Sequence, residues 1–283
     1  MAILSLDRWK LSIGDGQPLV VIAGLNVLED LDLALRVGRE LKAVAGELGL
    51  PYVFKASFDK ANRSSILSYR GPGLEKGLEI LKAVKAELNV PVCTDLHEVE
   101  QAAPVAAVAE LVQIPAFLCR QTDLVTAAAR ATADAGALLH VKKGQFLAPH
   151  DCRSILDKAF EAAGRHITVL CERGVSFGYN NLVVDMLGIP QMQALGAPVS
   201  IDATHAVQLP GAQLGANGGA STGGRRSGVP VIAKAAVAAG ADAVFLEFHP
   251  DPDKALCDGP SALPLEAARP LLAQLKAIRE ALA

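Results

Sequence analysis

Charged side chains follow most of the short apolar runs in this 283-residue sequence, at the point where each run ends. Buried strands rarely carry charge, and a single charge there could be an ion pair between neighbouring strands. A whole set indicates a site, and Lys and Arg in a cleft suit phosphate and carboxylate groups. We therefore expect a small phosphorylated polyanion as substrate. The residues concerned are Lys55, Lys60, Arg63, Asp95, Arg120, Lys142, Lys143, Glu172, Arg173, Asp202, His205, Glu247 and His249.

A second pattern concerns metal binding and covalent catalysis. His205, Glu247 and Asp258 could face one point from neighbouring strand ends, and this donor set suits a divalent cation. A complete site wants a fourth ligand, and the first strand offers only Asn26, which binds zinc or iron weakly. The position could therefore hold water alone. Lys142 could instead form a Schiff base with a carbonyl substrate, if burial left its amine neutral.

The elements that must position these side chains follow from an alternation of short aliphatic runs with longer amphipathic segments. Such runs, separated by helices, indicate a parallel sheet covered on both faces. We predict strands over Val20–Gly24, Tyr52–Ser57, Val90–Asp95, Leu111–Ala116, Leu138–Lys143, Ile167–Arg173, Val199–His205 and Ala243–His249. We predict helices over Leu31–Glu47, Leu74–Leu88, Val99–Val108, Leu124–Ala135, Ile155–Ala163, Val231–Ala239 and Pro264–Ala283.

Eight repeats of one strand and one helix predict an α/β fold, a closed (β/α)8 TIM barrel, with an open doubly wound sheet as the alternative. We expect one domain over residues 1–283, because such barrels commonly run to this length. Residues 1–16 are expected to form a hairpin that caps the barrel bottom, with Gly14–Gly16 as a turn. The Gly-rich segment Ala206–Ser227 is expected to be a lid, and its Arg225–Arg226 pair could close over phosphate, reach a partner subunit or lie in solvent.

Composition excludes several classes of protein. The 27 Lys and Arg against 30 Asp and Glu leave a net charge of −3, so nothing indicates a nucleic-acid partner. Hydrophobic residues make up 51% of the chain, yet no apolar stretch reaches membrane-spanning length, and no secretion signal is expected. The 4% aromatic content disfavours stacked bases or flavins. Five scattered cysteines predict reduced thiols in a cytoplasmic protein.

Several segments together resemble the 3-deoxy-D-manno-octulosonate 8-phosphate synthase family. Twelve consecutive residues, Phe54–Ser65, match the family's characteristic loop. The resemblance continues over most of the chain in Ser68–Gly73, Gln113–Leu118, Arg120–Leu124, Val141–Phe146, Glu172–Gly174, Phe177–Leu182, Asp202–Ala206 and Cys257–Pro264.

The resemblance implies a transferase of lipopolysaccharide biosynthesis. Its reaction condenses phosphoenolpyruvate with D-arabinose 5-phosphate and water, giving 3-deoxy-D-manno-octulosonate 8-phosphate and inorganic phosphate. It also implies a (β/α)8 barrel, a homotetramer and a cytoplasmic location. Carried over by motif, catalytic roles fall on Asn26, Lys60, Asp95, Lys142, His205 and Asp258. Substrate contacts fall on Lys55, Ser57, Lys60, Asn62, Arg63, Ser64, Gln113, Pro115, Ala116, Lys142, Arg173, His205 and Glu247.

The resemblance further implies that no metal cofactor is required. Metal-dependent members carry Cys where this chain has Asn26, whereas His205, Glu247 and Asp258 occupy the other metal-site positions. The Cys-Asp-Gly run at 257–259 points to the same metal-independent kind. Three other functions stay open: the related condensing enzyme that uses erythrose 4-phosphate, a Schiff-base aldolase built on Lys142, and a barrel used only for binding or assembly.

Overall fold

The computed structural model describes residues 3–214 and 220–282, and in it eight parallel strands form a closed ring. Each strand pairs with the next one of the ring, and the pairings of β14 with both β11 and β3 complete it. An open doubly wound sheet would leave two unpaired edges, so this closure confirms the predicted (β/α)8 barrel. The strands are β3 (Val20–Val27), β4 (Tyr52–Ser57), β5 (Val92–Asp95), β6 (Leu111–Ile114), β7 (Leu138–Lys142), β8 (Thr168–Glu172), β11 (Val199–Asp202) and β14 (Ala243–His249).

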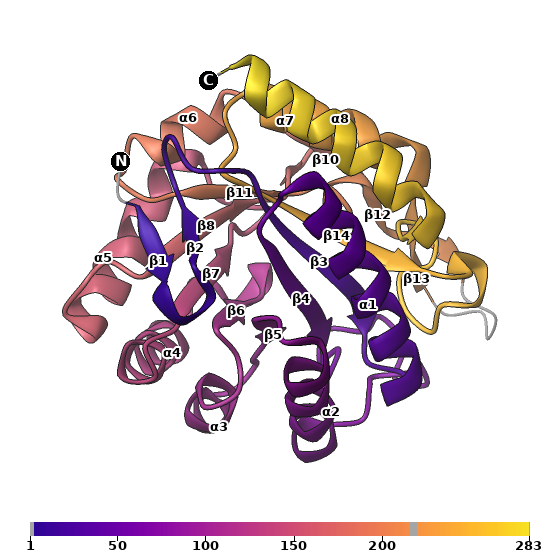
Figure 1. Ribbon diagram of the computed structural model, residues 1–283, viewed down its shortest axis with the longest axis horizontal. Coiled ribbons are helices and arrows are strands. Elements are labelled where there is room, and N and C mark those ends of the chain that lie inside the picture. Colours follow the sequence, from indigo (N-terminus) through magenta and orange to yellow (C-terminus); the bar gives the residue numbers. More distant parts are fainter. Residues whose placement is uncertain (1–2, 215–219, 283) are drawn as a thin grey trace.

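The helices follow one another around the outside of the ring (Figure 1). Within the described residues, no helix combines the length and apolar character needed to cross a membrane. The first helix is capped at its start by Asp30, whose carboxylate accepts a hydrogen bond from the Leu33 amide, and at its end by Gly49 in a left-handed conformation. The helices are α1 (Leu31–Leu48), α2 (Leu74–Leu88), α3 (Ala102–Ala106), α4 (Thr122–Asp134), α5 (Arg153–Ala163), α6 (Gly188–Gln193), α7 (Val229–Ala238) and α8 (Ala268–Ala281).

Three helices differ from the prediction. The helix expected over Val99–Val108 is a 3₁₀ turn over Val99–Gln101 followed by the short α3. Helix α6 was not predicted, because its six residues are too few to show a helical period. Helix α8 begins after the predicted start, since Leu263–Pro264 pair with β14 as the short strand β15.

Most predicted strands were too long at their ends, and side-chain hydrogen bonds to the backbone explain two of these differences. Strand β11 stops at Asp202, whose Oδ1 accepts a hydrogen bond from the backbone amide of His205 at 2.9 Å. Strand β8 stops at Glu172, whose Oε1 accepts from the amides of Arg173 and Gly174 at 2.9 and 2.6 Å. Both carboxylates turn the chain locally and so compete with the sheet ladder.

The N-terminal hairpin is present, but its turn lies elsewhere than predicted. Strands β1 (Leu4–Leu6) and β2 (Leu11–Ile13) pair antiparallel around a turn at Asp7–Lys10, and Gly14–Gly16 instead lead into β3. Lys10 takes the left-handed backbone conformation, with φ of 50°, which allows the reversal. Leu4 lies beside residues that precede β8 and β11, at the amino ends of the barrel strands. Residues 1–2 of the predicted hairpin lie outside the described residues.

The predicted irregular lid is in large part a second hairpin. Strands β12 (Gln208–Leu214) and β13 (Ala220–Gly224) pair antiparallel, with a register shift between Leu209 and Gln213. The tip of the predicted lid, residues 215–219, lies outside the described residues. Arg226 beyond the hairpin pairs with Asp253 at 2.8 Å and bonds the Gly259 carbonyl at 2.9 Å, so this arginine is held by the chain itself. Two further short strands, β9 (Val175–Ser176) and β10 (Leu182–Val183), form a small sheet after β8.

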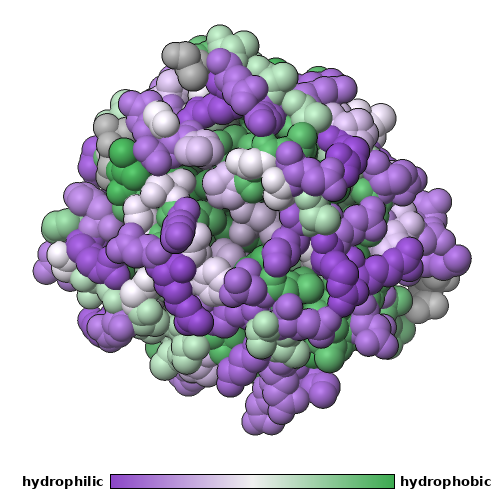
Figure 2. All heavy atoms as spheres, in the orientation of Figure 1, coloured by the Kyte–Doolittle hydropathy of each residue, from purple (hydrophilic) through white to green (hydrophobic). Residues whose placement is uncertain are grey.

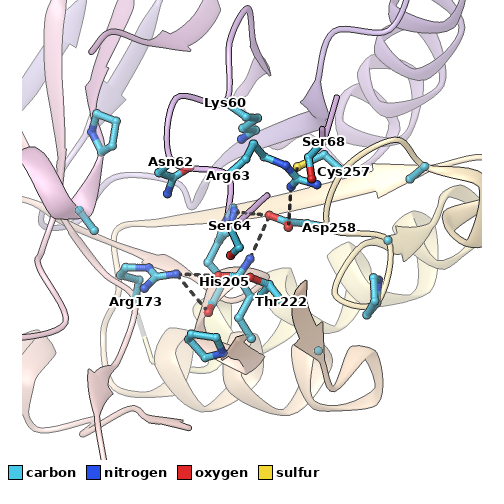
Figure 3. Close-up of a pocket in the computed structure, with 18 of the residues that line it drawn as sticks. Lys60, Asn62, Arg63, Ser64, Ser68, Arg173, His205, Thr222, Cys257 and Asp258 are labelled. Atoms are coloured by element: carbon cyan, nitrogen blue, oxygen red, sulfur yellow. Dashed lines mark hydrogen bonds and ion pairs between the residues drawn. The ribbon is translucent and has the colours of Figure 1, made fainter. Parts of the chain in front are cut away.

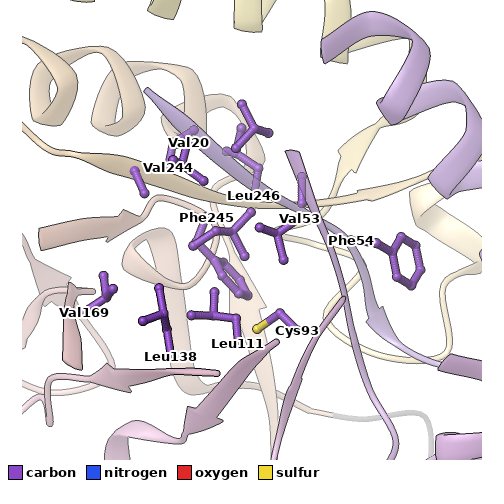
Figure 4. Packing of buried hydrophobic residues seen from close by; sticks show 14 of the residues in the cluster. Val20, Val53, Phe54, Cys93, Leu111, Leu138, Val169, Val244, Phe245 and Leu246 are labelled. Carbon is purple, nitrogen blue, oxygen red and sulfur yellow. The ribbon is translucent and has the colours of Figure 1, made fainter. Parts of the chain in front are cut away.

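The apolar part of the barrel interior consists mainly of aliphatic side chains around one phenylalanine ring. Figure 4 shows Phe245 pointing into the space between the strands, with Val53, Cys93, Leu111 and Leu138 around it. Phe54, in contrast, points outward, and its ring packs near Gly38 of α1. The outer surface is mostly hydrophilic, with hydrophobic areas separated from one another in the view of Figure 2.

All five cysteines are buried and none forms a disulfide. Burial raises the pKa of Cys93, Cys152, Cys171 and Cys257 to about 12. Thiolates of such cysteines are scarce at neutral pH, which disfavours a role as nucleophile for these thiols.

Candidate active site

A cavity of about 970 Å³ opens at the carboxyl ends of the barrel strands. Its walls come from strand ends, from the loop after β4 and from the β12–β13 hairpin. Figure 3 shows Lys60, Asn62 and Arg63 along one side and Arg173 along the other, with His205 and Asp258 between them. The carboxyl face is where barrel enzymes build active sites, because its loops can vary without disturbing the core. The cavity is thus the candidate active site.

Buried cations form the anion-binding part of this cavity. Lys60, Lys142 and Arg173 all line it, and each is at most 9% exposed. The Arg173 guanidinium donates to Gln208 at 3.0 Å, but its Nη1 is buried without a hydrogen-bond partner among the described residues. Buried donors are normally satisfied, so an unpartnered Nη1 fits an anionic ligand oxygen.

Lys142 is held by both an acid and an aromatic ring. Its Nζ lies 2.6 Å from Asp202 Oδ2 and 3.7 Å from the centre of the Phe245 ring. The ring face is electron-rich and attracts a desolvated ammonium group. The Phe245 ring therefore stabilises the positive charge of Lys142 through a cation–π contact. An ammonium paired with a carboxylate suits anion binding and not the attack on a carbonyl that a Schiff base requires.

Lys60, Asp95 and His97 form the second charged group of the cavity. Burial opposes the charge of Lys60, but Asp95 and Glu247 outweigh it and raise the pKa of the ammonium. Burial also opposes the charge of Asp95, whereas the hydrogen bond from His97 and the charge of Lys60 hold its pKa well below the usual range. His97 Nε2 lies 3.4 Å from Asp95 Oδ2, and Asp95 Oδ1 is buried without a partner in the described chain. An ionised acceptor next to a protonated lysine can bind a hydroxyl group or a developing alkoxide.

Beneath the cavity, the side chain of Asn26 lies among three polar groups. Its Nδ2 donates to Glu247 Oε2 at 2.6 Å and to Asp258 Oδ2 at 3.1 Å, and lies 3.5 Å from His205 Nε2. His205 is oriented from its other side by Asp202, which lies 2.8 Å from Nδ1. Burial opposes the charge of Glu247, but His205 and nearby lysines lower its pKa to about 2. Burial opposes the charge of Asp258 as well, and the hydrogen bond from His205 lowers its pKa below the usual range.

His205, Glu247 and Asp258 are also the residues that could hold a metal ion. One potential ligand atom from each lies within 4.8 Å of the others. The amide nitrogen of Asn26 lies near these atoms and donates hydrogen bonds to both carboxylates. The N–H group of Asn26 cannot ligate a metal, whereas its Oδ1 is buried without a hydrogen-bond partner among the described residues.

The loop after β4 places Asn62, Arg63 and Ser64 over the cavity. The Lys60 amide donates to the Arg70 carbonyl at 2.7 Å, and Arg70 also pairs with Asp59, so the loop is closed at its base. Arg63 Nη1 lies 2.7 Å from Cys257 Sγ and 3.6 Å from Asp258 Oδ1, while its Nε is buried without a partner in the described residues. Such an arginine can accept a bidentate anion.

The structure brings together most of the residues predicted from the sequence. Those that line the cavity are Lys60, Asn62, Arg63, Ser64, Asp95, Gln113, Pro115, Ala116, Lys142, Arg173, His205 and Asp258. Four others are buried and do not line it, namely Asn26, Lys55, Ser57 and Glu247. Lys55 and Glu247 pair with each other at 2.8 Å. Direct contact of these four with substrate stays a prediction.

The cavity residues that sequence reasoning missed include His97 and Gln208, which contact predicted site residues. His97 follows Asp95 by two positions, and the alternation of a strand would have suggested a shared face, had the strand been expected to continue. Gln208 bridges Arg173 and Asp258, with Nε2 donating to Asp258 Oδ2 at 2.9 Å. No sequence signal pointed to Gln208, because it lies in the segment expected to be irregular.

Comparison with known proteins agrees with this geometry. The DAHP synthetase I family matches residues 2–282 of the chain. A 2-dehydro-3-deoxyphosphooctonate aldolase of Desulfosudis oleivorans is 55% identical over 272 residues, covering 96% of this chain and 94% of the relative. Proteins of the same name from Shewanella piezotolerans and Shewanella halifaxensis are 51% and 53% identical, covering 98% of this chain and 95% and 94% of those relatives. The chain belongs to the DAHP synthetase I family.

Proposed function

We propose that this chain condenses phosphoenolpyruvate with D-arabinose 5-phosphate and water, releasing 3-deoxy-D-manno-octulosonate 8-phosphate and inorganic phosphate. The supporting observation is the identity of more than half the residues, over nearly the full chain, to proteins named 2-dehydro-3-deoxyphosphooctonate aldolase. The cavity agrees with two phosphorylated substrates, because both the buried Lys142 and Arg173 and the half-buried Arg63 line it. The product serves lipopolysaccharide biosynthesis.

The phosphoenolpyruvate end is assigned to Lys60, Gln113, Lys142 and Arg173, with the backbone near Pro115 and Ala116. The unpartnered Arg173 Nη1 and the Lys142 ammonium provide positive charge for the phosphate and carboxylate of this substrate. The cations are fixed before the substrate arrives, so little reorganisation is needed at the reaction step.

The pentose phosphate end is assigned to Asn62, Arg63 and Ser64 on the loop after β4. Arg63 exchanges its contact with Asp258 for the phosphate group. The cations of the rim offset the electrostatic repulsion between the two phosphorylated substrates. Positioning carbon 3 of phosphoenolpyruvate near the aldehyde makes the step effectively unimolecular.

Two groups of residues are assigned to the proton and water steps. Carbon 3 attacks the aldehyde carbon, and Lys60 supplies the proton to the developing alkoxide while Asp95 orients the hydroxyl. Water adds to carbon 2, oriented by His205 and Asp258, whose carboxylate accepts its proton. Loss of phosphate from that adduct then completes the reaction and makes it irreversible.

The function is tested by phosphate release from phosphoenolpyruvate with arabinose 5-phosphate or erythrose 4-phosphate as second substrate. We expect turnover with the five-carbon sugar and at most slow turnover with the four-carbon sugar. The reverse preference would assign the chain to the related condensing enzyme. Inactivation by borohydride in the presence of substrate, without phosphate release, would instead support Schiff-base chemistry at Lys142.

The chain is further proposed to work without a metal cofactor. The hydrogen bonds from Asn26 to Glu247 and Asp258 support this, because they satisfy both carboxylates in the absence of a cation. We expect unchanged turnover in strong chelator, and loss of activity that added manganese or zinc restores would contradict it. Asn26→Cys would add a thiolate to three existing ligand groups, and the purified variant should retain zinc in elemental analysis where the parent protein does not.

A homotetrameric assembly and a cytoplasmic location are proposed on the resemblance to the synthase family. Light scattering of the purified chain tests the assembly. A mass near four times 29.5 kDa is expected, and a monomer at micromolar concentration would contradict it.

A further inference from the structure

Three buried polar side chains form a hydrogen-bonded chain across the barrel interior, below the candidate active site. His140 of β7 lies between Gln113 of β6 and Ser200 of β11. Its Nδ1 is 3.2 Å from Gln113 Oε1, and its Nε2 is 2.8 Å from Ser200 Oγ. His140 and Ser200 are fully buried, and Gln113 is 3% exposed. Burying polar groups in such an interior costs free energy unless they are hydrogen-bonded, so these three residues are candidates for a functional role.

Gln113 is the member of this chain that reaches the cavity. It lines the cavity together with Pro115 and Ala116, whereas His140 and Ser200 do not. The contact of its Oε1 with His140 is its one side-chain hydrogen bond within the described residues. With the carbonyl oxygen turned toward His140, the amide nitrogen is the group that remains for a ligand.

The direction in which the Ser200 hydroxyl donates its hydrogen determines the His140 tautomer and, through it, the orientation of the Gln113 amide. The Ser200 hydroxyl has one hydrogen, and both His140 Nε2 and the Leu170 carbonyl, at 3.2 Å, are within its reach. If the hydroxyl donates to Nε2, the ring carries its hydrogen on Nδ1 and donates it to Gln113 Oε1. If the hydroxyl donates to Leu170, Nε2 carries the hydrogen, and Nδ1 can accept only from the Gln113 amide nitrogen. The second arrangement would turn the carbonyl oxygen toward the cavity.

The surroundings keep the ring neutral, which both arrangements require. Burial, together with the positive charges of Lys142 and Lys55, lowers the pKa of His140 to about 3, although Asp202 opposes this shift. Phe245 of β14 stacks against the imidazole, with ring centres 6.1 Å apart and planes at 14°. A neutral ring has one donor and one acceptor, so it can transmit direction along the chain.

We propose that His140 is a positioning residue for this cavity: its Nδ1–H tautomer fixes the Gln113 side chain so that the amide N–H donates to an anionic oxygen of the enol phosphate substrate. This deepens the proposed function and rests on it for the identity of the ligand. The Nδ1–H tautomer is the one that fits, because the cavity is lined by cations and serves anions, which accept hydrogen bonds but do not donate them.

The test combines variants with separate readouts for binding and turnover. In His140→Leu the ring is replaced by an apolar group, and we expect the KM for phosphoenolpyruvate to rise by ~10- to 100-fold, the range for a lost hydrogen bond to a charged group. The KM for arabinose 5-phosphate should change by less than ~3-fold, within ordinary variant scatter. His140→Asn keeps an amide donor near the position of Nδ1 and should restore most of the loss. Equal loss for both substrates in folded His140→Leu, or no restoration by His140→Asn, would overturn the proposal.

Gln113→Ala supplies the matched cycle. If His140 acts through Gln113, the double variant Gln113→Ala/His140→Leu should bind phosphoenolpyruvate as weakly as Gln113→Ala alone. Additive losses would show instead that His140 only supports the core. Calorimetric measurement of phosphoenolpyruvate binding, without the second substrate, tests the positioning role of His140 separately from the proposed reaction. A parent protein that binds phosphoenolpyruvate yet fails to turn over either sugar refutes the reaction, and equal binding by parent and folded variants refutes the positioning role.

A spectroscopic measurement on the unaltered protein does not depend on whether the variants fold. Long-range ¹H–¹⁵N spectra distinguish the two imidazole tautomers of His140, with the resonance assigned by its loss in His140→Asn or by its change in chemical shift in the milder Ser200→Ala variant. We expect the Nδ1–H form at neutral pH and its retention with phosphoenolpyruvate bound. A ring found as the Nε2–H form, or as imidazolium, overturns the proposal.

Discussion

Lys55 Nζ lies 2.8 Å from Glu247 Oε1, and both side chains are at most 1% exposed. The same carboxylate accepts from Asn26 through its other oxygen, so strands β3, β4 and β14 are joined by polar contacts directly under the cavity. Lys55 also donates to the Asn26 carbonyl at 3.0 Å. This buried ion pair therefore connects the three strands beneath the charged residues of the site.

Removing one member of this pair should be costly. We expect Glu247→Gln or Lys55→Met to lower the free energy of unfolding by about 3–5 kcal/mol, because the remaining charge is then buried without its partner. The double variant should lose clearly less than the sum of the single losses, and urea denaturation measures all three. Arg39→Met and Glu87→Gln remove an exposed pair and should each change stability by less than ~1 kcal/mol. Simple addition of the Lys55 and Glu247 losses would contradict the coupling.

The order of elements could be predicted from the sequence because apolar runs and amphipathic segments have different periods. Strand ends were harder to predict. The carboxylates of Asp202 and Glu172 turn the chain through hydrogen bonds to following amides, and an apolar run carries no sign of such a contact. The β12–β13 hairpin was missed for a related reason, since Gly-rich residues have weak strand propensity and pair here mainly through backbone geometry.

For the site, the rim residues could be predicted because strand ends converge on one face of a barrel. How deeply each side chain lies below the cavity could not be predicted in the same way. Lys55 precedes the end of β4 by two residues, and this difference puts its ammonium under the floor with Glu247 rather than in the cavity. The buried His140 also gave no signal, since one histidine within an apolar strand is most often a paired core residue.

Gly24 provides a test of how closely β3 and β4 approach each other. A Cβ atom at this position would lie 2.1 Å from the Lys55 carbonyl oxygen, and backbone cannot move aside as a side chain can. We expect Gly24→Ala to lower the free energy of unfolding by more than ~3 kcal/mol or to prevent soluble expression, which urea denaturation and yield would report. Gly46→Ala is the control, because a Cβ there meets nothing within 4 Å on the exposed side of α1. That variant should gain about 0.5–1 kcal/mol from helix propensity.

Arg63 tests the assignment of the two phosphate ends. Its guanidinium lies near Cys257 and Asp258 at the cavity wall, and its Nε has no hydrogen-bond partner among the described residues. Arg63→Lys keeps the charge but loses bidentate geometry, so the KM for arabinose 5-phosphate should rise by ~10-fold or more. The KM for phosphoenolpyruvate should stay within ~3-fold, as for variants distant from a ligand. The exposed Arg130→Lys on α4 serves as the matched control. A larger rise in the KM for phosphoenolpyruvate than in that for arabinose 5-phosphate would reverse the assignment of the two phosphate ends.

The buried ring of His140 should leave a pH signature in stability. Its pKa is about 3 in the folded chain, against an ordinary value of 6.5, so between these values the unfolded chain takes up a proton that the folded chain does not. The associated stability is fully present above pH 6.5 and falls by up to ~1.4 kcal/mol per pH unit as the pH drops toward 3. His140→Asn removes this group, so the stability advantage of the parent over the variant should shrink steadily from pH 6.5 to pH 4.5 in urea denaturation. His166→Asn controls for loss of an imidazole at an exposed position. A parent-to-variant difference that stays constant over this range would mean that His140 is protonated in both states or in neither.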